Sequence, residues 1–73
     1  MPPVSAHYLD DILKTGARLS IDAQGYPERV IKNLATVANA SGAHLIVRRA
    51  DTLGDMDVLD IARRGGSAVT VEV

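Results

Sequence analysis

Apolar residues recur along the chain with two different periods, which separate helical from extended segments. In the first segment, residues 1–17, four apolar positions follow the i, i+1, i+4, i+5 spacing of one helical face. These positions are Tyr8, Leu9, Ile12 and Leu13. Ser5 is a residue type that caps helix N-termini, and Gly16 is one that ends helices. The segment is therefore predicted to be a helix.

Three later segments alternate between apolar and polar residues, which predicts strands with one buried face. They are RLSIDA (18–23), AHLIVRRA (43–50) and AVTVEV (68–73). The middle one is the least polar and is expected to be the central strand.

Two helical patterns separate these strands. The first follows Pro27 and carries an apolar stripe from Val30 to Ala38. The second carries apolar residues from Met56 to Ala62, and Thr52 with Asp55 three residues later resembles a capping box. This helix is therefore expected to start at Thr52 and to end at the glycine pair 65–66.

An internal repeat sets the expected topology. A shift of 27 residues places Ile31 on Val58 and Leu34 on Ile61, so the chain reads as strand, helix, strand, helix, strand. Such units form parallel strands with right-handed crossovers. Because the alternation leaves one face polar, both crossover helices should lie on one face, which requires sequential strand order.

The sequence thus predicts an α/β fold: an N-terminal helix and then β-α-β-α-β, with a three-stranded parallel sheet in order 1-2-3. We expect a single domain, 1–73, made of the helical segment 1–17 and the tandem strand-helix unit 18–73. In this register Arg48 lies between Asp22 and Glu72. Opposite charges on neighbouring strands contribute roughly 0.2 to 1 kcal/mol per pair, so we expect Arg48 to pair with these acids.

Composition narrows the classes of function. The chain has no cysteine, a net charge of -1, and no basic cluster longer than a pair of arginines, so neither a disulfide framework nor nucleic-acid binding is expected. No apolar run approaches the ~20 residues of a membrane span, and no signal peptide is evident, which favours a cytoplasmic protein without membrane contact. No motif indicates a catalytic residue, metal or cofactor. A core this small favours self-association.

The principal candidate site is the polar face of the sheet together with the edge of the third strand. Its residues are Arg18, Ser20, Ile46, Arg48, Ala68, Thr70, Glu72 and, at the end of the third strand, Val73. Two covers are open at this point: the N-terminal helix folded back, or a protein partner. The partner could be a second copy, docked through the third strand or the open face. We therefore expect a non-enzymatic protein interaction module that self-associates.

An alternative is a small-ligand binder or accessory enzyme subunit. It would use the edge where strands end, because ligands of parallel sheets bind there. The residues are Asp22, Gln24, Asp51 and Thr52. No phosphate-binding glycine motif accompanies them, so capping and turn roles account for them better. His7 with Asp10 and Asp11 has helical spacing that could bind a cation, but exposed polar residues near a helix start are the simpler interpretation.

The repeating strand-helix unit resembles the leucine-rich-repeat class of solenoid over residues 18–73. The resemblance rests on paired apolar strand positions. These are Leu19 with Ile21, Leu45 with Val47 and Val69 with Val71. The asparagine after the strand and the LxxLxL register of that class are absent. The resemblance implies binding through the open strand face and carries over no catalytic residue.

Overall fold

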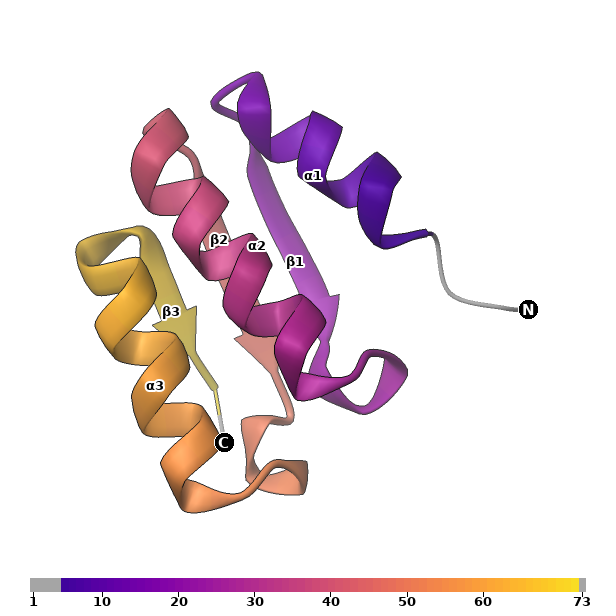
Figure 1. Cartoon of the computed structure of the whole chain (residues 1–73), viewed down its shortest axis with the longest axis vertical. Helices are drawn as coiled ribbons and strands as arrows, with labels where there is room; N and C mark the ends of the chain where they lie inside the picture. The colour runs from indigo at the N-terminus through magenta and orange to yellow at the C-terminus, as the bar shows by residue number, and fades with distance from the viewer. Residues whose placement is uncertain (1–4, 73) are drawn as a thin grey trace.

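The computed structural model describes residues 5–72 and has the predicted order of elements. The helices are α1 (Ala6–Lys14), α2 (Glu28–Ser41) and α3 (Asp55–Gly65). The strands are β1 (Arg18–Asp22), β2 (His44–Arg48) and β3 (Val69–Val71). Three short 3-10 helices connect them: η1 (Ala23–Gly25), η2 (Ala50–Thr52) and η3 (Gly66–Ala68). The three strands pair in parallel in the order β1-β2-β3, which confirms the predicted fold (Figure 1).

All three helices form one layer on one face of the sheet. Leu45 and Val47 of β2 have no accessible surface, and they share a core with Ile31 and Leu34 of α2 and Leu13 of α1. α1 therefore joins the helical layer beside α2 and does not cover the open face, which settles the alternative left open above. The Cα trace measures 30 × 29 × 17 Å, so its thickness holds one sheet and one layer of helices.

Local signals place α1 and α2 as expected. The Ser5 side chain accepts a hydrogen bond from the backbone N–H of Tyr8 at 3.3 Å, which caps α1. Gly16, at φ 85°, lies in the turn that leads to β1. Pro27 directly precedes α2, and Gly42, at φ 71°, ends that helix in the left-handed conformation.

The predicted start of α3 is wrong. The helix begins at Asp55, and its N-cap is Gly54, which has no side chain to cap with. Thr52 belongs to η2 instead, and its hydroxyl donates to the carbonyl of Arg49 at 2.8 Å. The Thr52 hydroxyl that was expected to cap α3 therefore stabilises the turn after β2 instead.

The end of α3 also differs in detail from the expectation. Only Gly66 has positive φ, 56°, whereas Gly65 is helical and buried. A Cβ on Gly65 would overlap the side chain of Val69 and lie 3.5 Å from the Cβ of Ala35. Gly65 therefore allows α3 to approach β3 and α2 closely. β3 is shorter than the predicted segment, since Ala68 lies in η3, and Val73 falls outside the described residues.

A polar contact joins α2 to α3 at the surface of the helical layer. The ammonium group of Lys32 lies 3.0 Å from Asp57 and 3.5 Å from Asp60. The hydrogen bond with Asp57 raises the pKa of Lys32 above its ordinary value. Within residues 5–72, no helix is long and apolar enough to cross a membrane.

Candidate functional site

The face of the sheet opposite the helices has the composition predicted from the alternation, except that Ala68, which was also expected there, lies in η3 and packs against the core. We call this face the bare face. Its residues are Arg18, Ser20, Asp22, His44, Ile46, Arg48, Thr70 and Glu72. The observed register places Ser20 beside Ile46 and Ile46 beside Thr70, so the middle row of this face is uncharged, as predicted. Ile46 is half-buried at its centre, between exposed Ser20 and Thr70.

Charged side chains lie in the rows on either side of this uncharged row, toward the two ends of the strands. Arg18 is at the start of β1, and its neighbour on β2 is His44, whose Nε2 lies 2.7 Å from the hydroxyl of Thr70. Arg48 is at the end of β2, beside Asp22. In the described part of the chain, neither Arg18 nor Arg48 forms an ion pair within 4.0 Å. Within residues 5–72, the bare face therefore has two cationic groups without an ion pair, although the charge of Arg48 contributes to lowering the pKa of Asp22.

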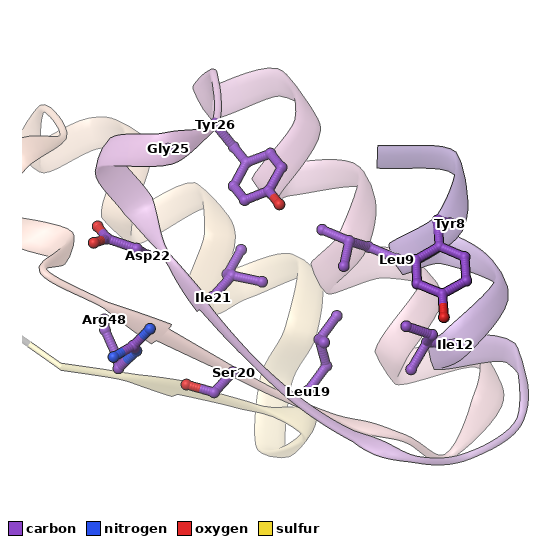
Figure 2. A pocket seen from close by; sticks show the side chains of 10 residues that line it. All are labelled: Tyr8, Leu9, Ile12, Leu19, Ser20, Ile21, Asp22, Gly25, Tyr26 and Arg48. Carbon is purple, nitrogen blue, oxygen red and sulfur yellow. The ribbon is translucent and has the colours of Figure 1, made fainter. Parts of the chain in front are cut away.

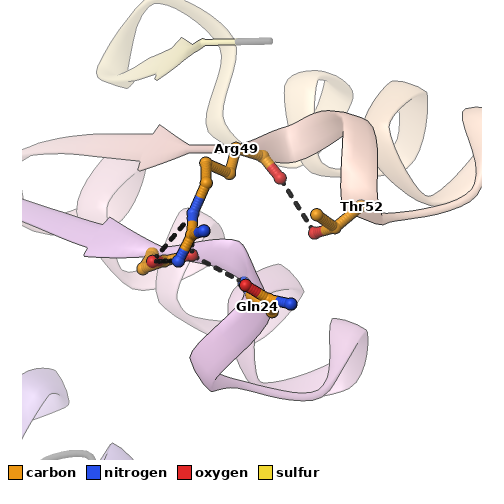
Figure 3. A network of polar contacts seen from close by, with 4 residues as sticks. Gln24, Arg49 and Thr52 are labelled. Atoms are coloured by element: carbon orange, nitrogen blue, oxygen red, sulfur yellow. Dashed lines mark hydrogen bonds and ion pairs between the residues drawn. The ribbon is translucent and has the colours of Figure 1, made fainter.

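The prediction that Arg48 pairs with Asp22 and Glu72 is wrong, although the register behind it is right. Asp22 pairs instead with Arg49, whose Nε lies 3.0 and 3.2 Å from its two carboxylate oxygens (Figure 3). Arg49 has φ 55°, the left-handed conformation, directly after the strand. This turn brings the Arg49 side chain to Asp22, a geometry that strand alternation cannot predict. The Arg49 guanidinium lowers the pKa of Asp22 below its ordinary value.

At the carboxyl edge of the sheet, three of the four predicted ligand-binding residues take part in turn contacts. Asp22 accepts a hydrogen bond from the backbone N–H of Gln24 at 2.9 Å, and so caps η1 (Figure 3). Thr52 closes the equivalent turn η2 through its bond to Arg49. Asp51 is exposed in the same turn. The structure brings η1 and η2 together at this edge, and the polar groups of Asp22 and Thr52 bond to neighbouring residues of the chain.

A pocket of about 410 Å³ lies along the outer side of β1, between this strand and α1 (Figure 2). Four consecutive strand residues line it, together with side chains from α1 and the η1 turn. The lining is Tyr8, Leu9, Ile12, Leu19, Ser20, Ile21, Asp22, Gly25, Tyr26 and Arg48. Consecutive strand residues point to opposite faces, so a pocket that contacts all four follows the edge of the strand. We call this pocket the β1 groove.

Sequence reasoning missed the β1 groove. The available signal was the width of the apolar stripe on the first helix, which is larger than the core needs. Leu9 and Leu13 are buried, but Ile12 is half-buried and Tyr8 is 57% exposed. The groove itself arises from the lateral position of α1 relative to β1, which no local pattern specifies.

The acidic and histidine residues considered for a cation do not form a cluster. His7 Nε2 lies 4.0 Å from Asp11, one turn along α1, and both side chains are largely exposed. No group of three or more His, Cys, Asp or Glu residues with metal-binding proximity occurs within residues 5–72.

Comparison with protein-family models, with curated proteins and with solved structures found no match for this chain. The resemblance to leucine-rich repeats therefore rests on the strand and helix pattern alone.

Proposed function

We propose that this chain is a small non-enzymatic interaction module that binds a second copy of itself through the bare face of its sheet. The observation that carries the proposal is the one-sided cover of a parallel sheet. Parallel sheets in proteins are normally covered on both faces. Here the three helices lie on one face, and the other face is exposed within residues 5–72.

The arrangement of charge on the bare face favours a second copy as the occupant. Consider a two-fold axis that runs between the two sheets over Ile46, parallel to the sheets and perpendicular to the strands. It exchanges the two ends of every strand and places Ile46 against Ile46, Arg18 against Asp22, and Arg48 against His44 of the second copy. The uncharged middle row then forms the centre of the contact and the charges its rim, the usual anatomy of a protein interface.

The face is preferred over the edge of β3, which was also predicted to be a contact surface. β3 has only three paired residues, Val69–Val71, and α3 lies beside it in Figure 1. Short edges next to a helix offer little backbone for pairing with another chain. The bare face presents three strands at once.

Sedimentation equilibrium over a concentration series tests the proposal. Three proteins are compared: the wild type, Ile46→Asp on the bare face, and Asn33→Asp, an exposed position on α2 in the helical layer. We expect wild type and Asn33→Asp to show the same concentration-dependent mass. Ile46→Asp should weaken the dimer by more than about tenfold, because it places a charge at the centre of the contact.

Two outcomes overturn the proposal. One is a wild-type chain that stays monomeric up to about 1 mM. The other is an Ile46→Asp variant that associates as strongly as Asn33→Asp, which would locate the contact on another surface.

A further inference from the structure

The β1 groove combines an apolar cleft with an unpaired strand edge. β1 pairs with β2 alone, so its outer side has no strand partner in the described chain. Leu19 and Ile21 point into the cleft from the strand, and Leu9 and Ile12 line it from α1 (Figure 2). The groove thus offers apolar contacts and backbone hydrogen-bonding groups at the same place.

The register identifies which backbone groups are free. The carbonyl of Val47 accepts a hydrogen bond from the N–H of Glu72 at 2.9 Å, so the peptide groups of Val47 point to β3. Backbone groups alternate along a strand, so those of Ile46 point to β1 and bond the neighbours of its register partner Ser20. The N–H and C=O of Ser20 therefore point outward, into the groove.

The position of α1 decides what can use this edge. Figure 1 shows α1 on the side of β1 that faces away from β2. Antiparallel pairing of β1 with β1 of a second copy would place both helical layers on the same side of the joined sheet and bring the two α1 helices together. A single extended segment between β1 and α1 meets no such obstacle and can bond the free edge.

Charge specifies the side chains of such a segment. An added strand directs alternate side chains into the cleft and onto the bare face. The first set meets Leu9, Ile12 and the exposed ring of Tyr8. The second set lies beside Arg18, Ser20 and Asp22 of β1 and near Arg48 of β2, which also lines the groove. Arg18 and Arg48 form no ion pair within residues 5–72, whereas Asp22 is already paired with Arg49.

We propose that the β1 groove binds an extended peptide segment in which apolar residues alternate with acidic ones, added to the sheet as a strand beside β1. This site shares Arg18, Ser20, Asp22 and Arg48 with the bare face, so peptide binding and the self-association proposed above compete. Its occupant is recognised by three features together: backbone bonds at Ser20, apolar side chains in the cleft, and carboxylates near Arg18 and Arg48.

The test uses blocked hexapeptides in which valine, leucine or phenylalanine alternates with glutamate, titrated to about 1 mM into the labelled full chain. Amide chemical shifts of the protein are followed by NMR in wild type and in Ile46→Asp. Two control peptides accompany each sequence: one has lysine in place of glutamate, and one is N-methylated at every second residue, which removes backbone donors.

Binding should shift the amides of Leu19–Asp22 and of α1 in Ile46→Asp, where the bare face is free, and more weakly in wild type, where self-association competes for Arg18 and Arg48. The N-methylated peptide should fail to bind, and the lysine peptide should bind about two- to fivefold more weakly. In the Ile46→Asp background, Arg18→Glu should weaken the glutamate peptide by a similar factor. Arg63→Glu, an exposed position on α3, should leave it unchanged. Tyr8→Ala should also weaken binding, since it removes one wall of the cleft.

Three results overturn the proposal: no shift at Leu19–Asp22 with any glutamate peptide, equal binding of the N-methylated peptide, or shifts centred on β3. The self-association of the bare face is measured separately by sedimentation. A monomeric wild type that binds peptide contradicts only the dimer, and a dimeric wild type whose Ile46→Asp variant binds no peptide contradicts only the groove.

Discussion

The two faces of β2 differ sharply although they alternate along the same five residues. Leu45 and Val47 have no accessible surface, whereas Ile46 between them is only half-buried and Arg48 is exposed. The first pair is packed under α2, and the second faces solvent. The difference separates the two faces of one strand: the helical face contributes to the core, and the bare face stays outside it.

The largest expected change in the free energy of unfolding distinguishes the two faces at adjacent residues of β2. Leu45→Ala removes a side chain with 0% exposure and should lower the free energy of unfolding by roughly 2 to 5 kcal/mol. Ile46→Ala should change it by less than about 1 kcal/mol, because that side chain faces away from the core. Urea denaturation followed by circular dichroism measures both. Equal losses at the two positions would show that the bare face is packed in the monomer.

The next effect tests how closely the helical layer approaches the sheet. Gly65→Ala should destabilise the fold by roughly 1 to 3 kcal/mol, because the new methyl group overlaps Val69. Gly25→Ala is the matched control, since a Cβ there meets nothing within 4 Å. Its effect should stay within about 0.5 kcal/mol. Thermal unfolding of the two variants distinguishes them, and a neutral Gly65→Ala would contradict the close contact between α3 and β3.

Much of the fold was predictable because strand alternation and helical spacing are local signals. The alternation of residues 18–23 and 43–50 gave the register of β1 and β2, and it placed Ser20, Ile46 and Thr70 in one row. The one-sided pattern also gave the strand order. These inferences succeed because the side chains of a strand alternate with a period of two residues.

The parts that failed depend on contacts between elements. Thr52 has the sequence context of a helix cap, but its hydroxyl closes the turn after β2. Arg49 pairs with Asp22 because of a left-handed backbone residue that the alternation does not reveal. The β1 groove depends on where α1 packs. A sequence pattern shows how wide the apolar stripe of a helix is, but it does not show which element that stripe contacts.

The smallest expected effect is a difference in melting temperature between variants of two adjacent arginines at the end of β2. Arg49→Gln should lower the melting temperature more than Arg48→Gln, because Arg49 holds Asp22 and Arg48 has no ion-pair partner within residues 5–72. A larger fall in melting temperature from Arg48→Gln would indicate that Arg48 pairs with Asp22 and Glu72, as the sequence predicted.

The pH dependence of that difference has a defined sign. The Arg49 guanidinium lowers the folded-state pKa of Asp22 below its ordinary value of 3.8. The stabilisation is therefore present above pH 3.8 and is lost as the pH falls through the lower folded-state pKa. The gap in melting temperature between wild type and Arg49→Gln should be constant near neutral pH and should shrink below about pH 4. A gap that persists in acid would contradict the ion pair.

The most direct test of the bare face as a contact surface uses the absence of cysteine from the chain. Ile46→Cys and Asn33→Cys each introduce one thiol, the first at the centre of the bare face and the second on the helical layer. The rate of disulfide-linked dimer formation under mild oxidation is compared at equal protein concentration. We expect rapid cross-linking through the thiol at position 46 and slow cross-linking at position 33, whereas equal slow rates at both positions would contradict a contact through the bare face.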